Sequence, residues 1–121
     1  MPIKNVLIVE DDVAQLVHLQ GLLAGAGYAV STANNGQEAL TKARADHPDA
    51  ILMDINMPVM DGFAAARGLK NDASTKDIPI VFVSAKDQKA DRVWATMNGA
   101  KGYITKPYQP NEILDQLKTL G

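Results

Sequence analysis

Short continuous runs of apolar residues, separated by helical patterns, are the feature that most constrains the fold of this chain. Continuous rather than alternating apolarity is typical of strands that are covered on both faces, as in a parallel sheet. A fifth segment, residues 28–32, has mixed polarity and is expected at a sheet edge. The four apolar runs are residues 6–9 (VLIV), 50–53 (AILM), 80–83 (IVFV) and the weaker pair 103–104 (YI).

Between these runs, apolar residues recur at helical spacing, so each predicted strand is followed by a predicted helix. Strands that alternate with helices indicate right-handed crossovers and a doubly wound three-layer α/β sandwich. We expect residues 1–121 to form a single domain without an output domain. The predicted helix faces are Leu16, Leu19 and Leu23; Leu40 and Ala43; Phe63 and Ala66; Val93 and Met97; and Ile113, Leu117 and Leu120.

The overall composition excludes several classes of function. A net charge of -2 gives no reason to expect binding to nucleic acid or to anionic lipid. The absence of cysteine excludes disulfides, thiol catalysis and zinc–thiolate sites. The sequence contains neither a signal-peptide pattern nor an apolar run long enough to span a membrane, so we expect a cytoplasmic protein.

Polar side chains follow four of the five predicted strands. In doubly wound sheets, function gathers at the carboxyl edge of the strands, so these side chains are expected to converge. Each also has an ordinary interpretation: a helix cap for the acids of the first strand, a turn residue, a capping box of Ser84 with Asp87, and a solvated lysine. Taken together, these ordinary interpretations are less plausible than one functional site, because four separate strand ends would each have supplied a complementary polar group by chance. The residues are Glu10, Asp11 and Asp12, then Asp54, Ser84 and Lys106.

Metal-assisted phosphoryl transfer is the chemistry that fits this set. Clustered carboxylates repel one another unless they take up protons or bind a cation, and oxygen ligands of this kind suit Mg²⁺. Asp54 is a candidate nucleophile that forms an acyl phosphate. Lys106 would pair with one phosphoryl oxygen, and the Ser84 hydroxyl would donate a hydrogen bond to another.

Four motifs in this order, "LIVEDD", "LMDINMPVMDG", "VFVSAKD" and "GYITKP", resemble the receiver domains of bacterial two-component response regulators. The resemblance covers the whole chain. It implies a flavodoxin-like (βα)5 fold with strand order 2-1-3-4-5, and a histidine kinase or histidine phosphotransfer domain as the phosphoryl donor. It also implies a phosphoacceptor that assists its own phosphorylation and dephosphorylation, rather than an enzyme.

The resemblance assigns a role to each matching position. Mg²⁺ ligands would be Glu10, Asp11, Asp54 and the backbone carbonyl of Asn56. Asp54 would be the phosphoacceptor, with Ser84 and Lys106 contacting the phosphoryl group, while Asp12 would cap a helix. Glu10 stands where the family more often has Asp, so its metal contact would run through a water. Ser84 and Tyr103 would change position when the protein switches. Asn56 and Lys86 would tune the rate of dephosphorylation. The Lys106–Pro107 peptide bond is expected to be cis.

The segment "KDQKADRVWATMNGAKGYITKP" is similar to small stand-alone regulators of chemotaxis-like systems that control type IV pili and twitching motility. Ordinary helix packing explains Trp94 equally well. Because the sequence shows no output domain, the expected output is a contact of the last two helices and strand with a downstream protein. The alternative is a sink that drains phosphate from the kinase. We expect a monomer.

Three other classes of protein fit the sequence less well. An aspartyl phosphatase usually has a second acid two residues after its nucleophile, where this chain has Asn56, which cannot act as a general acid. The glycines of residues 21–27 precede a strand, the wrong order for a dinucleotide-binding loop. A receiver fold that serves only as a docking surface is disfavoured by the complete acid, hydroxyl and lysine set. His18 and His47 are assigned to no metal.

Overall fold

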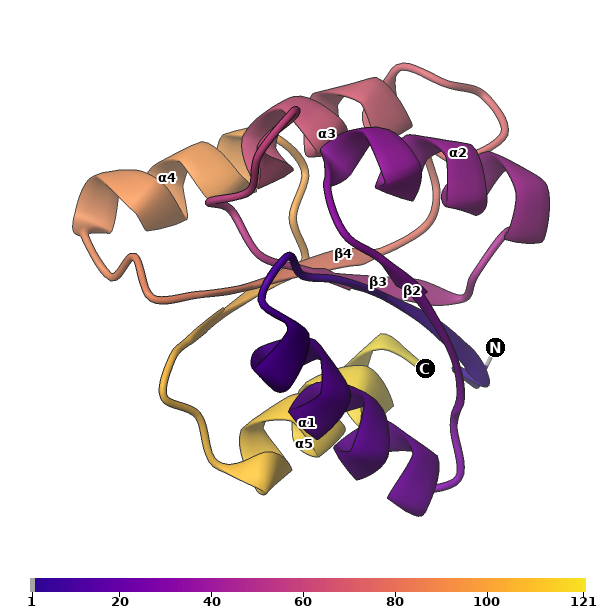
Figure 1. Ribbon diagram of the computed structural model, residues 1–121. Helices are drawn as coiled ribbons and strands as arrows, with labels where there is room; N and C mark the ends of the chain where they lie inside the picture. The colour runs from indigo at the N-terminus through magenta and orange to yellow at the C-terminus, as the bar shows by residue number, and fades with distance from the viewer. Residues whose placement is uncertain (1) are drawn as a thin grey trace.

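A computed structural model describes residues 2–121 as alternating strands and helices (Figure 1). The strands are β1 (Asn5–Val9), β2 (Ala29–Ala33), β3 (Ala50–Met53), β4 (Ile80–Ser84) and β5 (Gly102–Thr105). The helices are α1 (Val13–Gly25), α2 (Gly36–Asp46), α3 (Gly62–Lys70), α4 (Lys89–Met97) and α5 (Pro110–Leu120). No helix in this described part of the chain is long and apolar enough to cross a membrane.

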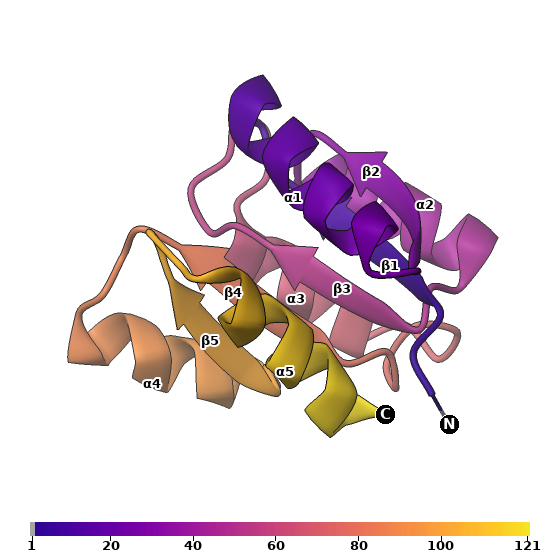
Figure 2. The ribbon, with the colours of Figure 1, turned by 90° about the horizontal axis from the view of Figure 1, so that it is seen from below.

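The five strands form one parallel sheet in the order β2-β1-β3-β4-β5, which confirms the predicted fold. The mixed strand β2 lies at one edge, as expected. Helices α2, α3 and α4 cover one face of the sheet, and α1 and α5 cover the other (Figures 1 and 2). From β1 the chain adds β2 on one side and β3 on the other, so the direction of strand addition reverses between β1 and β3. Ligands of doubly wound folds bind outside the strand ends at that point.

The continuous apolar runs contribute to two separate cores because successive strand residues point to opposite faces. In β1, Leu7 and Val9 pack with the α2–α4 side, whereas Val6 and Ile8 pack with the α1–α5 side. All four are buried. The sequence pattern is therefore continuous because both faces are covered.

Val93 and Met97 lie on one face of α4, as the spacing predicts, but that face is not the buried one. Their exposed fractions are 47% and 73%, and Ala95 is the buried residue of that helix. The suggested capping box of Ser84 and Asp87 is wrong. Ser84 is the last residue of β4, and the box at α4 is formed by Gln88 and Asp91.

Candidate functional site

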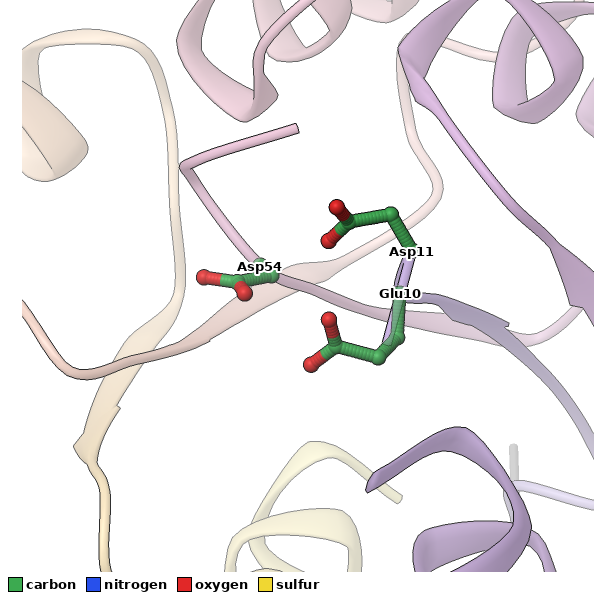
Figure 3. A group of neighbouring side chains, drawn as sticks. All are labelled: Glu10, Asp11 and Asp54. Atoms are coloured by element: carbon green, nitrogen blue, oxygen red, sulfur yellow. The ribbon is translucent and has the colours of Figure 1, made fainter. Parts of the chain in front are cut away.

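Three carboxylates meet at the carboxyl edge of the sheet, where β1 and β3 end side by side. Glu10 and Asp11 follow β1, and Asp54 follows β3 (Figure 3). The Asp54 backbone N–H donates to the Val9 carbonyl oxygen at 3.0 Å, which holds the two strand ends together. One oxygen of each carboxylate lies within 4.8 Å of the others, a spacing at which they could hold one metal ion.

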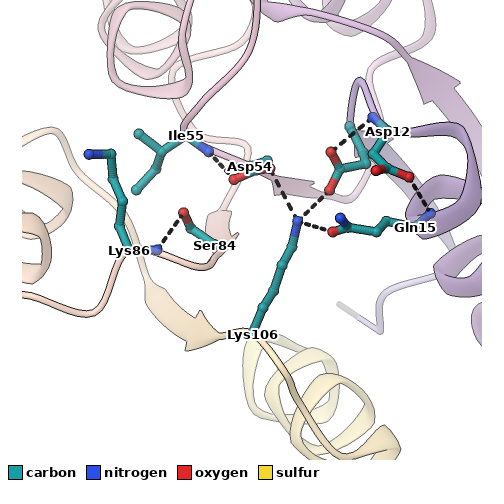
Figure 4. A network of polar contacts seen from close by, with 8 residues as sticks. Asp12, Gln15, Asp54, Ile55, Ser84, Lys86 and Lys106 are labelled. Atoms are coloured by element: carbon teal, nitrogen blue, oxygen red, sulfur yellow. Dashed lines mark hydrogen bonds and ion pairs between the residues drawn. The ribbon is translucent and has the colours of Figure 1, made fainter.

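The Lys106 ammonium lies among these acids, although Lys106 follows β5 at the far edge of the sheet (Figure 4). Its Nζ donates to Glu10 Oε1 at 2.5 Å and to Asp54 Oδ2 at 3.1 Å. It also donates to Gln15 Oε1 on α1. The Lys106–Pro107 peptide bond is cis, as the family resemblance implies.

The electrostatics of the site reflect burial of like charges around one cation. Burial raises the pKa of Glu10 and the nearby Asp54 charge adds to this, while the Lys106 contact acts in the opposite direction. Burial would lower the pKa of Lys106, but hydrogen bonds and charge from Glu10 and Asp54 outweigh it, so the pKa is raised. The site therefore favours a cation and places Lys106 there in its charged form.

The loop that follows Asp54 folds back tightly against this residue. Asp54 Oδ1 accepts a hydrogen bond from the Ile55 backbone N–H at 2.7 Å, and the Gly62 N–H donates to the Ile55 carbonyl at 2.8 Å. A Cβ at Gly62 would lie 2.3 Å from the Asp54 carbonyl oxygen, so glycine is required for this approach. Asn56 is exposed two residues beyond Asp54. No group among residues 2–121 donates a hydrogen bond to its carbonyl oxygen.

Ser84 and Tyr103 lie on neighbouring strands, Ser84 at the carboxyl end of β4 and Tyr103 two positions before the end of β5. Ser84 is buried at the end of β4, and its Oγ accepts a hydrogen bond from the Lys86 backbone N–H at 3.2 Å. The Tyr103 hydroxyl donates to the Lys86 carbonyl at 2.6 Å. The backbone of the loop residue Lys86 therefore contacts both the Ser84 hydroxyl (Figure 4) and the Tyr103 hydroxyl.

The ring of Tyr103 has a second set of contacts that the sequence did not indicate. The Arg92 guanidinium of α4 lies 4.8 Å from the ring centroid and donates to Thr105 Oγ1 at 2.7 Å. Phe82 of β4 lies 6.4 Å away, centroid to centroid. Sequence reasoning missed both Arg92 and Gln15, because neither belongs to a strand-end motif.

Asp12 and Lys86 play smaller parts than the strand-end acids. Asp12 caps α1, where its side chain accepts from the Gln15 N–H at 3.1 Å, as expected. The side-chain ammonium of Lys86 makes no hydrogen bond or ion pair with any of residues 2–121.

A cavity of about 550 Å³ extends from Asp54 and Lys106 along α1 to His18 and Tyr108.

With the geometry established, similarity to known proteins identifies the class. The response regulator receiver domain family matches residues 6–118. The chain is 39% identical over 116 residues to Protein PilH of Pseudomonas aeruginosa, with 96% of each chain covered. It is equally identical to the response regulator PleD of Caulobacter vibrioides, but spans only 26% of that protein. The chain belongs to the response regulator receiver domain family.

Solved structures agree with this assignment. The chemotaxis protein CheY4 of Vibrio cholerae has a TM-score of 0.92 at 32% identity, with 98% of this chain and 99% of that chain covered. The receiver domain of the sensor histidine kinase PA1611 from Pseudomonas aeruginosa has a TM-score of 0.90 at 29% identity, covering 97% and 96%. That structure has a magnesium ion coordinated in its active-site cleft.

Proposed function

We propose that this protein is a signalling switch controlled by phosphorylation of Asp54. The observation that carries the proposal is the Lys106 ammonium, which reaches across the sheet edge to contact both Glu10 and Asp54. A lysine in that place can neutralise the charge of a phosphoryl group on Asp54. The Glu10 and Asp54 carboxylates thereby share one ammonium, and Ser84 ends the neighbouring strand β4.

Phosphorylation is a displacement at phosphorus. An Asp54 carboxylate oxygen attacks the phosphorus of a phosphohistidine, the P–N bond breaks, and its electron pair returns to the imidazole of the donor. Lys106 then stabilises the phosphoryl oxygens with its positive charge. The donor is a histidine kinase or a histidine phosphotransfer domain.

Glu10, Asp11, Asp54 and the Asn56 carbonyl are the groups that would hold Mg²⁺. The fit is supported by three carboxylate oxygens within 4.8 Å of one another and by the unpartnered Asn56 carbonyl in residues 2–121. Oxygen ligands from few carboxylates suit this ion. When bound, Mg²⁺ supplies charge neutralisation on the transferring group.

The switch runs from Ser84 to the outer face of α4 and β5. A phosphoryl oxygen draws the buried Ser84 hydroxyl from its contact with the Lys86 N–H, which shifts the loop that also holds the Tyr103 hydroxyl. Asn56 and Lys86 flank this path and tune how long the phosphoryl group survives. The phosphoryl group need only favour one of two packings by a few kcal/mol to change partner binding.

The pathway we favour is chemotaxis-like signalling that controls type IV pili, with an unknown protein as the downstream contact. It is supported by the similarity to Protein PilH over nearly the whole length of both chains. That residues 1–121 act without an output domain, as a cytoplasmic monomer that is not an enzyme, stays a prediction. Action as a phosphate sink is the alternative output.

The direct test is to incubate the pure protein with acetyl phosphate, with and without Mg²⁺, and to measure intact mass. We expect a gain of one phosphoryl group that requires Mg²⁺ and is lost in Asp54→Asn. Asp11→Asn should raise the Mg²⁺ concentration that is needed for full phosphorylation. Asp46→Asn, at the exposed end of α2, should leave that concentration unchanged. No gain of mass under either condition would overturn the proposal and favour a docking module.

A further inference from the structure

Gln15 contacts the site although no motif includes it. It lies in the first turn of α1, and its side-chain oxygen accepts a hydrogen bond from Lys106 Nζ, 91 residues away in the sequence (Figure 4). Lys106 therefore has three acceptors: Glu10, Gln15 and Asp54. An ammonium has three N–H donors, so each acceptor takes one.

The three acceptors come from two separate places. Glu10 and Gln15 belong to the end of β1 and the start of α1, whereas Asp54 belongs to the end of β3. The directions of the three N–H bonds of an ammonium are fixed relative to one another. Two contacts to the β1–α1 side therefore aim the third N–H at Asp54 Oδ2.

We propose that Gln15 is a positioning residue for phosphoryl transfer, which holds the Lys106 ammonium so that its remaining N–H points at the oxygen on Asp54. The inference rests on the proposed function of Asp54. When the phosphoryl group is attached, the N–H that pointed at the carboxylate meets a phosphoryl oxygen, and the Glu10 and Gln15 contacts remain. The lysine then needs no reorientation during the reaction.

The local structure holds Gln15 in place for this contact. Its backbone N–H donates to the Asp12 side chain at 3.1 Å, and the next residue of α1, Leu16, is buried in the core. The carboxamide oxygen is a neutral acceptor. A neutral group anchors the lysine without adding a negative charge to a site that already contains three carboxylates and must receive a phosphoryl anion.

The test compares Gln15→Met, which keeps side-chain length but removes the acceptor, with Gln20→Met, an exposed glutamine of the same helix. We expect Gln15→Met to lower the rate of phosphorylation by acetyl phosphate and Mg²⁺ by about threefold to tenfold, the effect of one lost hydrogen bond. Gln20→Met should match the wild type. Adding Gln15→Met to Lys106→Met should cause no further loss, because the effect acts through the lysine.

A second readout does not depend on phosphorylation. In nitrogen-15 NMR spectra of the unphosphorylated protein, the Lys106 ammonium protons should exchange with water faster in Gln15→Met than in Gln20→Met. Equal exchange in the two variants, or a rate loss that persists in the Lys106→Met background, would overturn the inference. A wild type that takes up no phosphoryl group while exchange still differs would reject the function of Asp54, and with it the role in transfer, but not the contact.

Discussion

At the scale of single residues, Glu10 both contacts Lys106 and belongs to the carboxylate cluster that could hold a cation. It is 6% exposed, contacts Lys106 at 2.5 Å, and lies near enough to Asp11 and Asp54 to share a cation with them. Its side chain is one methylene longer than that of aspartate, and we expect its metal contact to run through a water.

Glu10→Gln should therefore weaken Mg²⁺ binding without displacing Lys106. The amide oxygen still accepts the lysine hydrogen bond, but the charge that orients the metal and its water is lost. We expect the Mg²⁺ affinity to fall by about 10- to 100-fold, as for other outer-shell partners of metals. Isothermal titration calorimetry with Mg²⁺ measures it, and Asp46→Asn is the control for a lost surface charge. Unchanged affinity would place the metal elsewhere.

Val59 is the one residue in the Asp54 loop with a strained backbone. Its φ is 70°, and the Met60 N–H donates to the Pro58 carbonyl at 2.7 Å, which closes a γ-turn around it. A β-branched residue is disfavoured in this region, whereas asparagine tolerates it. The Val59 side chain is 82% exposed, so replacing it removes little packing.

Val59→Asn should accordingly raise the free energy of unfolding by about 1 kcal/mol. Chemical denaturation measures the change. Val17→Asn, at an exposed position of α1 with helical backbone, should change it by less than about 0.5 kcal/mol. A loss of stability in Val59→Asn would show that the turn is not strained by the valine.

At the scale of elements, Arg92 joins α4 to β5. The guanidinium lies over the Tyr103 ring and donates to Thr105. Helix α4 has one buried residue, Ala95, so it lacks the broad apolar face that anchors the other helices. A helix held in this way can move when the loop before it moves, which suits a switch.

Arg92→Met should loosen this attachment. The loss of a cation–π contact and a hydrogen bond should lower the free energy of unfolding by about 1 kcal/mol, and the Tyr103 ring resonances should shift in NMR spectra. Arg67→Met, at an exposed position of α3, serves as the control. An unmoved Tyr103 signal would mean that Lys86 alone holds the ring.

The turn after α3 has a pH-sensitive carboxylate. Hydrogen bonds from the Ser74 hydroxyl and N–H, and then the Arg44 contact, lower the pKa of Asp72 from 3.8 to about 2. Because the folded state prefers the charged form, the stabilisation is complete above pH 3.8 and is lost as the pH falls towards 2.

Asp72→Asn should thus melt at a lower temperature than the wild type at pH 6, and the difference should shrink as the pH falls below 3.8 towards 2. Thermal melts followed by circular dichroism at several pH values provide the measurement. Asp87→Asn, at an exposed acid before α4, is the control for the loss of a surface carboxylate. A difference in melting temperature that stays constant with pH would show that the effect does not come from the charge of Asp72.

At the scale of the whole molecule, the sequence was sufficient to predict the parallel sheet and the convergence of its strand ends. The continuous apolar runs required cover on both faces, and the position of Asp54 after one of them placed it at the carboxyl edge. Helix α4 was predicted less well. Val93 and Met97 have helical spacing, but a helix over the outer strands buries only a narrow face, so that spacing did not identify the buried side.

The contacts of Gln15 and Arg92 could not be predicted in the same way. Gln15 meets a residue 91 positions away, and Arg92 meets the ring of a neighbouring strand. Such pairs depend on the three-dimensional positions of whole elements rather than on local pattern. Motifs that mark strand ends are local, so the sequence pattern alone indicates Glu10, Asp54, Ser84 and Lys106.

A phosphoryl group on Asp54 is expected to change the face formed by α4 and β5. The most direct measurement is a comparison of two-dimensional NMR spectra of the protein before and after phosphorylation with acetyl phosphate and Mg²⁺. We predict that Ser84, Lys86, Tyr103 and residues of α4 shift together, and that Ser84→Ala removes the shifts in α4 while Asp54 is still phosphorylated. Shifts confined to the loops around Asp54, with α4 and Tyr103 unchanged, would contradict the account.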